Sequence, residues 1–484
     1  MSREPRVVII GAGLAGITAL HVFTQRGCTD VTVLDKASDV GGVWHWNHYP
    51  GLTCDVPSQL YQFGFAPKPD WSHVWADGRD IQRYHREVVD SLGLGDHIRL
   101  NTEVIAAQWG ADTASWTLTT TDGEQIVADV VVCATGVLHH PATPDIPGLD
   151  EFAGPVVHTA RWDDELETRG RRVAVIGTGS TGVQIVSALQ PSAAAIAHYV
   201  RSPQWILWAP MSLRQSAFLS AALTRWPKVH DALYRGLLWA SGILADITTR
   251  PSWRRRTVQG YARLCLRLQV RDQDLRNRLT PDYQPLCKRQ VVSGTYYRAI
   301  QSGNAELVTE QITEVTPTGI RTADGRDRPV DVIILATGFH THNYMRPMEI
   351  TGRDGLTIDK AWAGGPRAYR MTAIPGFPNL FTVLGPNSPT GSISLQYSAE
   401  RTADYIARFL QMLRDGTATS IEVTEEATDE FNAAVAEAMT PTVWNTGCNS
   451  WYRTENNTID LWPYDRATLT AMLAAPEPGH FDIR

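Results

Sequence analysis

The sequence predicts an α/β fold of two doubly wound, Rossmann-type dinucleotide-binding domains, with a helical insertion in the second domain. Two observations predict this fold. A strand, a glycine-rich turn and a helix occur in that order at residues 7–26 and again at residues 172–190. A second apolar strand follows each unit, at residues 31–34 and 196–200, and this is the order of a βαβ unit in a parallel sheet.

Two further apolar strands end in the same tripeptide, Ala-Thr-Gly, at residues 134–136 and 336–338. Small residues after a buried strand allow a sharp turn and a close approach to a ligand. We expect the chain to cross between the domains near these points. The first domain would then be discontinuous, with residues 1–150 and 336–484, and the second domain would span residues 151–335.

Residues 205–280 interrupt the second domain. Their pattern is helical, rich in Trp and Arg, and without strand signals. Two interpretations of this insertion are open. Its helices pack on the rest of the second domain, or they line a substrate cavity. A strand at residues 380–384 and a helix after Ser398 are expected to complete the first domain.

The composition excludes several classes of protein. With 43% hydrophobic and 20% charged residues the chain has the balance of a globular protein, and its formal charge of −7 provides no basic field for nucleic acid. Six scattered cysteines lack metal-ligand spacing and indicate reduced thiols in the cytoplasm, without a metal site. No signal peptide is recognisable, and the apolar stretch at 236–247 is shorter than the ~20 residues of a transmembrane helix. It indicates a core or interfacial helix.

Each glycine-rich turn has the spacing G-x-G-x-x-G between a strand and a helix, the context that gives this motif physical meaning. The first glycine permits the turn, the second lets the backbone approach a pyrophosphate, and the third allows close packing of helix on strand. The helix N-terminus adds a partial positive charge. The predicted cofactor-binding residues in the two turns are Gly11, Gly13, Ala15 and Gly16, and then Gly177, Thr178, Gly179, Ser180, Thr181 and Gly182.

The two units differ at one matched position. Asp35 lies 19 residues after the last glycine of the first turn, and Arg201 lies 19 residues after that of the second. A carboxylate accepts hydrogen bonds from ribose hydroxyls and repels a 2′-phosphate, whereas an arginine does the reverse. The first site is therefore expected to hold FAD and the second NADPH. Cys54 has no cysteine close to it in sequence, which disfavours a disulfide reductase and leaves monooxygenases, NADPH oxidases and diaphorases.

Residues 152–163 resemble the fingerprint of type I Baeyer–Villiger monooxygenases, in the class B flavin-dependent monooxygenase family. They fit F-x-G-x-x-x-H-x-x-x-W-D, and residues 41–55 fit a second signature of the same family. Amine- and sulfur-oxidising relatives usually carry Tyr or Phe in place of the fingerprint tryptophan. The segments Cys287-Lys288-Arg289 and Asn449-Ser450-Trp451-Tyr452 are also similar to the family. The fingerprint residues are Phe152, Gly154, His158, Trp162 and Asp163.

The resemblance implies the conversion of a ketone to an ester or lactone with NADPH and molecular oxygen, through a C4a-peroxyflavin. Such chemistry requires a fixed cation near the developing negative charge and the exclusion of water. Arg289 resembles the family's catalytic arginine, and Asp55 resembles the acid that orients it. A guanidinium stays charged at any working pH. For His158, a role in a hinge between the domains is favoured over proton transfer.

The resemblance also implies further cofactor contacts. Trp44 and Tyr61 would flank the flavin, and Val104 would meet the adenine end of FAD through its backbone. Lys288 would contact the 2′-phosphate of NADP together with Arg201. The remaining positions implied by the resemblance are Lys36, Gly42 and Val43 for FAD, and Ser202 and Trp451 for the nicotinamide nucleotide.

Three alternatives stay open at this point. A flavin monooxygenase could oxidise nitrogen or sulfur, and an NADPH oxidase would release peroxide with any substrate. The basic, Trp-containing segment at 250–256 could touch an anionic membrane surface, although the favoured interpretation is a solvated basic helix edge. The expected partners are molecular oxygen and a lipophilic ketone, without nucleic acid. The sequence does not identify the ketone or the oligomeric state.

Overall fold

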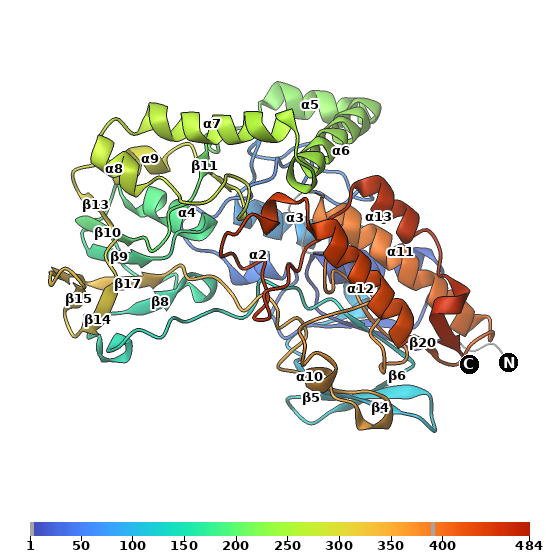
Figure 1. The fold of residues 1–484 in the computed structure, drawn as a ribbon. Helices are drawn as coiled ribbons and strands as arrows, with labels where there is room; N and C mark the ends of the chain where they lie inside the picture. Colours follow the sequence, from blue (N-terminus) through green and yellow to red (C-terminus); the bar gives the residue numbers. More distant parts are fainter. Residues whose placement is uncertain (1–3, 389–392) are drawn as a thin grey trace.

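The structure is a computed structural model that describes residues 4–388 and 393–484. Its first lobe, on the right in Figure 1, is built around a five-stranded parallel sheet in the order β19-β7-β1-β2-β3. The strands are β1 (Val7–Ile10), β2 (Val31–Leu34), β3 (Ile98–Arg99), β7 (Val130–Cys133) and β19 (Leu380–Thr382). Because β19 follows the whole second lobe in sequence, this sheet combines two separated parts of the chain.

The second lobe, on the left in Figure 1, repeats the arrangement with a sheet in the order β13-β10-β9-β17-β8. All four neighbouring pairs are parallel. Its strands are β8 (Val156–His158), β9 (Arg172–Ile176), β10 (Ala195–Tyr199), β13 (Ala305–Val308) and β17 (Val332–Leu335). Two Rossmann-type units are therefore present, as the repeated motif predicts.

The central strands are fully buried because helices cover both faces of each parallel sheet, and their continuous Val and Ile runs reflect this. In the first lobe α1 (Leu14–Gln25) packs against α11 (Leu395–Arg414), which begins three residues before the predicted helix start. In the second lobe α4 (Ser180–Leu189) packs against α9 (Tyr296–Ile300). The other helices of the first lobe are α2 (Val43–Trp46), α3 (Gly78–Ser91), α10 (Ile358–Ala361), α12 (Glu425–Met439) and α13 (Arg466–Met472).

Small sheets lie at the margins of the two lobes. The largest has the order β18-β4-β5-β6 and forms the lower edge of the molecule in Figure 1. The strands outside the two central sheets are β4 (Val104–Gly110), β5 (Ser115–Thr120), β6 (Gln125–Ala128) and β18 (Glu349–Thr351); β14 (Ile312–Thr316), β15 (Gly319–Thr322) and β16 (Asp327–Pro329); β11 (Ile206–Leu207) and β12 (Val291–Val292); and β20 (Ile421–Val423) and β21 (Phe481–Ile483).

The predicted insertion is mostly helical. It contains α5 (Ala217–Arg225), α6 (Pro227–Thr249), α7 (Trp253–Gln269) and α8 (Gln273–Arg278). Ser216, Ser252 and Asp272 cap α5, α7 and α8 by accepting a backbone N–H hydrogen bond, so each of these helices begins where a capping residue stands. The two-residue strand β11 lies in this segment and was not predicted, because so short a strand leaves no alternation to recognise.

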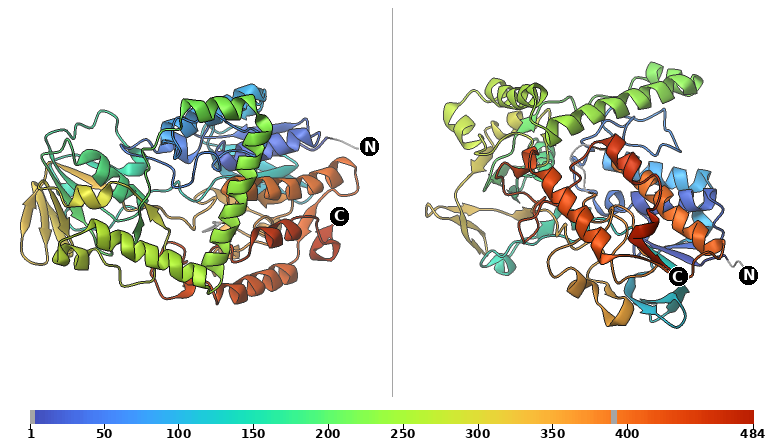
Figure 2. Two further views of the ribbon diagram at one scale, coloured as in Figure 1. Left: turned by 90° about the horizontal axis from the view of Figure 1, so that it is seen from above. Right: turned by 45° about the vertical axis from the view of Figure 1, so that its right-hand side comes forward.

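Helices α5, α6 and α7 lie across the upper side of both lobes, in front of the other elements when the molecule is viewed from above (Figure 2, left). His230 of α6 accepts or donates hydrogen bonds with Gln59 and Gln62 of the first lobe, and Arg466 of α13 donates to the Leu238 carbonyl of α6. The insertion is therefore anchored to the first lobe. None of the helices in the described residues is long and apolar enough to cross a membrane.

The chain crosses twice between the lobes, and the two crossings pair with each other. Ala142 donates a backbone hydrogen bond to Gly338 at 2.9 Å, and His340 donates one to His140 at the same distance. Thr337 adds a side-chain bond to the carbonyl of Ala142. The Ala-Thr-Gly segments thus lead into a two-stranded connection, which has the form of a hinge.

Candidate active site

A cavity of about 1770 Å³ lies where the two lobes meet the C-terminal segment. Most of the residues singled out from the sequence line it. They are Gly11, Gly13, Ala15, Asp35, Lys36, Gly42, Val43, Trp44, Asp55, Tyr61, Val104, Gly177, Thr178, Gly179, Ser180, Thr181, Arg201, Ser202, Lys288, Arg289 and Trp451. Gly16 and Gly182 lie behind this lining, and the five fingerprint residues are not part of it.

The first glycine-rich turn is shaped by its neighbours. β1 and β7 end side by side, so Gly11 meets the end of the Ala-Thr-Gly strand, and a Cβ atom added at Gly11 would lie 2.6 Å from the carbonyl oxygen of Ala134. Gly11 also has a φ of +109°, which favours glycine. A Cβ atom on Gly16 would lie 1.7 Å from the Gly11 carbonyl oxygen, so this glycine allows α1 to pack on the turn.

The second turn has the same construction. β9 and β17 end together, Gly177 has a φ of +118°, and its added Cβ atom would lie 2.2 Å from the carbonyl oxygen of Ala336. Gly182 repeats the packing role, with a distance of 2.1 Å to the Gly177 carbonyl oxygen. A Cβ atom on Gly179 would meet no atom within 4 Å. Gly179 therefore faces open space where a pyrophosphate could approach the backbone.

Both turns are suited to dinucleotides. α1 and α4 begin directly after Gly13 and Gly179, and neither helix has a side-chain cap, so their first N–H groups are free to bind an anion at the cavity wall. The carboxylate of Asp35 accepts hydrogen bonds from the backbone N–H of Ala12 at 2.6 Å and of Ala37 at 2.8 Å. These bonds fix Asp35 at the end of β2, where it lines the cavity.

The matched position of the second lobe holds a group of cations. Lys288 donates to the Ser202 hydroxyl at 3.2 Å, and its Nζ lies 4.4 Å from the centroid of the Tyr283 ring. Burial lowers the pKa of Lys288, the nearby Asp282 carboxylate opposes this shift, and the Arg201 charge adds to it. Over residues 4–388 and 393–484, no carboxylate forms an ion pair with Arg201 or Lys288. Two cations that form no ion pair at one cavity wall suit the binding of a phosphate group.

Arg289 and Asp55 form a bidentate ion pair across the two lobes. The Arg289 Nη2 atom lies 2.9 Å from both Asp55 carboxylate oxygens, and Nε lies 3.1 Å from Oδ2. The attraction of Asp55 raises the pKa of Arg289 against the opposing effect of burial. The side chains of Arg289 and Asp55 are 39% and 20% exposed, and both line the cavity, so the guanidinium offers N–H groups to a bound molecule.

Aromatic residues flank this ion pair. Trp44 donates its indole N–H to the Tyr61 hydroxyl at 3.0 Å, and the two rings meet edge to face with centroids 5.6 Å apart. Cys54 lies beside them, and its burial raises the pKa of the thiol well above its usual range. A protonated thiol without a second cysteine does not fit a disulfide reductase, as the sequence predicts.

The expectation of six reduced thiols was wrong. Cys287 and Cys448, separated by 161 residues in sequence, form a disulfide, while Cys28, Cys54, Cys133 and Cys265 are free. The spacing of the cysteines in sequence did not indicate this pair, because the two residues become neighbours only in the folded chain. Cys287 directly precedes Lys288 and Arg289, and Cys448 directly precedes the segment that contains Trp451. The bond therefore joins two walls of the cavity, and thiol usage no longer indicates a reducing compartment.

The disulfide leads to a direct prediction. A thiol titration of the unreduced, denatured protein is expected to find four thiols, because two of the six are bonded. The Cys287→Ser/Cys448→Ser double variant is expected to lose about 2–5 kcal/mol of stability, measured by denaturant unfolding, since a long loop loses its cross-link. A Cys28→Ser variant is the matched control. Six titratable thiols without reductant would contradict the bond.

The fingerprint residues belong to the second lobe and do not line the cavity. His158 ends β8, accepts a hydrogen bond from the Ala160 N–H at 3.1 Å, and packs edge to face on Phe339, which follows the second crossing. Trp162 is buried in the core of the second lobe. Asp163 accepts a backbone hydrogen bond from Glu165 and does not reach the cavity. This placement is consistent with a hinge role for His158, which stays a proposal.

Two sets of contacts were missed from the sequence. Tyr49 donates to Gln184 of α4 at 2.9 Å, and Gln184 donates in turn to the Thr53 carbonyl, so a first-lobe loop is tied to the second lobe. Tyr452 adjoins Arg289, and burial raises its pKa to about 12. Tyr49 and Tyr452 lie inside motifs that were noticed, and this was the available signal, but neither side chain was assigned a partner.

The sequence left two interpretations of the insertion, packing and the lining of a substrate cavity, and its tryptophans do not support the second. Trp205 is buried and donates to the Tyr283 carbonyl at 2.7 Å. The other four are exposed, and none of the five lines the cavity; they are Trp208, Trp226, Trp239 and Trp253. The helical pattern was recognised correctly, but it does not state which side of a helix faces the protein.

Comparisons with known proteins agree with this geometry. A family model described as pyridine nucleotide-disulphide oxidoreductase matches residues 5–229. The chain is 44% identical, over its whole length and 97% of the relative, to an uncharacterized monooxygenase of Mycobacterium tuberculosis. It is also 38% identical to a Baeyer–Villiger monooxygenase of Streptomyces coelicolor, over 95% of the chain and 88% of that protein.

Solved structures show the same architecture over the full chain. A structure of OTEMO in complex with FAD and NADP superposes with a TM-score of 0.90 at 25% identity, covering 100% of both chains. Cyclohexanone monooxygenase from Rhodococcus sp. Phi1, bound to NADP+, gives a TM-score of 0.88 at 29% identity and covers 99% of both chains. The similarity to a Baeyer–Villiger monooxygenase over almost the whole chain agrees with the two lobes, the two glycine-rich turns and the Arg289–Asp55 pair. The chain belongs to the Baeyer–Villiger monooxygenase family.

Proposed function

We propose that this protein is an FAD-containing, NADPH-dependent monooxygenase that converts a ketone to an ester or lactone with molecular oxygen, and that Arg289 is its catalytic residue. The observation that carries the assignment to Arg289 is the position of its guanidinium. It lies at the cavity wall where the two lobes meet, and the bidentate bond to Asp55 fixes it there. An arginine held in this way provides a permanent positive charge between two dinucleotide sites.

The residues around each turn suit one of the two cofactors. In the first lobe the Asp35 carboxylate matches free ribose hydroxyls, so this turn would hold FAD, with Trp44 and Tyr61 beside the ring system. In the second lobe Arg201 and Lys288 match a 2′-phosphate, so this turn would hold NADPH. The other cofactor-binding residues proposed from the sequence are those already named in the cavity lining, together with Gly16 and Gly182 behind the turns.

The chain's own residues provide charge, orientation and enclosure. The flavin, when bound, supplies the redox chemistry by which hydride from NADPH and molecular oxygen become an oxidant. Arg289 stabilises the negative charge that develops on oxygen while the ketone is oxidised, and it is fully protonated throughout because Asp55 raises its pKa. Asp55 is a positioning residue, since both its oxygens are used to hold the guanidinium. The aromatic wall of Trp44 and Tyr61 limits access of water.

The same-family alternative, oxidation of nitrogen or sulfur, needs no cation fixed beside a developing oxyanion. A paired assay separates the two. The purified protein is incubated with a cyclic ketone and with a thioether, and NADPH use is followed with product mass. We expect ester or lactone from the ketone in proportion to NADPH. If the thioether gives sulfoxide while no ketone of a broad panel gives ester or lactone, the result would favour the alternative. If the amount of peroxide released equals the amount of NADPH used, the protein would be an oxidase.

Arg201→Ala is expected to raise the KM for NADPH by roughly 10- to 150-fold, since the loss of one charged hydrogen bond to the 2′-phosphate costs about 1.5–3 kcal/mol. The KM for NADH should change little, because NADH lacks that phosphate. Steady-state kinetics with both nucleotides provide the measurement. Arg169→Ala, at an exposed turn of the same lobe, is the matched control. Equal effects of Arg201→Ala on both nucleotides would place the 2′-phosphate elsewhere.

A further inference from the structure

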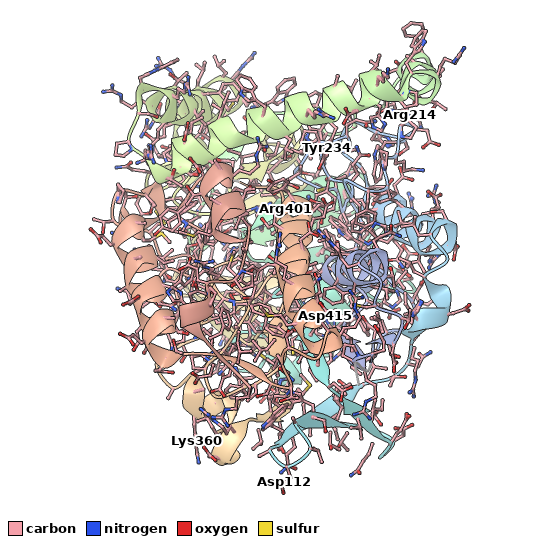
Figure 3. The ribbon with its side chains drawn as sticks, turned by 90° about the vertical axis from the view of Figure 1, so that its right-hand side faces the viewer. Asp112, Arg214, Tyr234, Lys360, Arg401 and Asp415 are labelled. Carbon is pink, nitrogen blue, oxygen red and sulfur yellow. A yellow bond between two sulfur atoms is a disulfide. The ribbon has the colours of Figure 1, made fainter. Side chains whose placement is uncertain are left out.

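The helices of the insertion form an uncovered surface on one side of the molecule. We call residues 205–270, which contain α5, α6 and α7, the cap. Viewed from above, no other element lies in front of these helices (Figure 2, left). Figure 3 shows the cap edge-on at the top, with side chains projecting away from the body and Tyr234 on the underside of α6. The outward side of the cap is thus open to a partner.

This surface is unusually apolar. Of the nineteen large apolar side chains that are exposed within the described residues, twelve belong to the cap, and these include every one with half or more of its surface exposed. Phe218 is 83% exposed, Trp253 67% and Trp239 66%. Exposed apolar groups scattered singly need no explanation, but a concentration of this kind marks an interaction site. The side chains at least half exposed are Leu213, Phe218, Trp226, Val229, Trp239, Trp253 and Leu268.

The cap is also strongly basic in an acidic protein. It contains ten Arg and Lys residues and two Asp residues, a formal charge of +8. The whole chain carries −7, so the rest of the chain carries −15. Nine of the ten basic side chains are exposed, and the exception, Arg255, is buried and donates to the carbonyls of Ile247 and Thr248. Positive charge and exposed apolar surface are therefore concentrated in the same segment, the cap.

The two long helices display these residues at helical spacing. On α7 the exposed residues Trp253, Tyr261, Leu264 and Leu268 lie along one stripe, with exposed arginines beside it at positions 254, 256, 263 and 267. The opposite side of α7, with Ala262 and Leu266, is buried in the second lobe. One apolar face of α7 thus packs on the second lobe. A second apolar face, with arginines on both sides of it, is exposed.

α6 shows a similar outward stripe. Five exposed residues of this helix follow a spacing of three, four, three and one positions; they are Val229, Ala232, Gly236, Trp239 and Ala240. Solvent alone does not account for such a stripe, because a solvated helix face is polar. The sequence left a choice between a core and an interfacial helix here, and the exposure of these residues favours the interfacial one.

We propose that the cap docks on an anionic phospholipid membrane, with α6 and α7 lying in the plane of the interface. Trp, Leu and Phe side chains with arginines around them suit the boundary between lipid headgroups and acyl chains. The +8 charge complements an anionic surface and orients the acidic remainder of the protein away from it. A second copy of the chain fits less well, since a two-fold interface through the cap would place +8 against +8.

The cap is joined to the proposed active site by a short pair of strands. β11, at the start of the cap, pairs with β12, which begins at Val291 soon after Arg289. A docked cap would thus hold the cavity near a phase in which lipophilic compounds concentrate. The exposure and charge of the cap are independent of the proposed function.

Vesicle flotation of the FAD-loaded, full-length protein tests the proposal. Vesicles of phosphatidylcholine alone are compared with vesicles that contain 30 mol% phosphatidylglycerol. We expect flotation with the anionic vesicles at low salt and much weaker flotation with neutral ones. Arg254→Glu/Arg267→Glu removes two arginines and adds two carboxylates, so it should lower binding by at least about 25-fold, and Trp239→Ser/Trp253→Ser should lower it by about tenfold or more. Brominated lipid should quench tryptophan fluorescence in wild type but much less in the tryptophan variant.

The matched control is Val127→Ser/Lys360→Glu, on the opposite side of the molecule from the cap. Val127 is exposed on β6 and Lys360 on α10, and Figure 3 labels Lys360 at the lower end. This variant should float like wild type. Wild-type protein that stays out of the anionic vesicles would overturn the proposal. So would a wild-type dimer in analytical ultracentrifugation that Trp239→Ser/Trp253→Ser dissociates, without vesicle binding, because the cap would then be an interface between copies.

Discussion

Replacement of Arg289 by alanine is expected to lower ester formation by at least about 100-fold while NADPH still reduces the flavin. The loss of one preorganised donor to a developing oxyanion typically costs about 10²–10³ in rate. Arg289 also loses its bidentate bond to Asp55, so the variant leaves a half-buried carboxylate at the cavity wall. That negative charge would oppose the same step. Stopped-flow reduction and gas-chromatographic product analysis measure the two halves of the cycle separately.

Arg289→Lys is the informative control. It keeps a positive charge but cannot form the two-pronged bond to Asp55, so a partial loss of ester formation is expected. Bound flavin and the thermal midpoint should match wild type in both variants if Arg289 acts on the reaction. Normal ester yield in Arg289→Ala would remove this residue from the mechanism. Loss of flavin binding would instead assign Arg289 a structural role.

The second large effect concerns the two glycine-rich turns. The Gly11→Ala variant is expected to lose the ability to retain FAD. The Gly177→Ala variant should retain FAD, but NADPH should reduce this flavin at least about 100-fold less efficiently than in wild type. Each substitution forces a Cβ atom against a backbone carbonyl, at 2.6 Å and 2.2 Å, and at a φ that disfavours side chains. Because the two sites are built alike, the pair separates the assignment of FAD from that of NADPH.

Gly123→Ala serves as the control for backbone strain alone. Its φ is +86°, but an added Cβ atom would meet nothing within 4 Å. This variant should bind both cofactors. Flavin absorbance after purification and reduction under anaerobic conditions provide the measurements, with circular dichroism to verify the fold. FAD loss in Gly177→Ala with normal binding in Gly11→Ala would reverse the assignment of the two lobes.

Local patterns predicted much of the fold. The apolar runs, the glycine spacing and the Ala-Thr-Gly endings are confined to short stretches, and the structure places each of these strands in one of two parallel sheets. The contact between Gly11 and Ala134 shows why the tripeptides recur, since each one packs behind a glycine-rich turn. The family's motifs then identified Asp55 and Arg289, and these two residues meet although 234 positions separate them.

Other features could not be predicted because they depend on which surfaces meet. The disulfide of Cys287 and Cys448 joins distant segments with no shared pattern around them. The bond from Tyr49 to Gln184 exists only because the lobes approach each other. The tryptophans of the cap follow a helical spacing that is the same for an inward and an outward face, and the structure turns Trp239 and Trp253 outward.

Oxidation of a ketone under ¹⁸O₂ tests the central claim most directly. With NADPH in the assay, the account predicts an ester or lactone that contains one ¹⁸O atom, with one NADPH consumed for each product molecule. Mass spectrometry of the product with parallel recording of NADPH absorbance gives both numbers in one experiment. Ester without the label, or NADPH consumed with peroxide as the sole oxygen product across a panel of cyclic, aryl, steroid and long-chain ketones, would contradict the account.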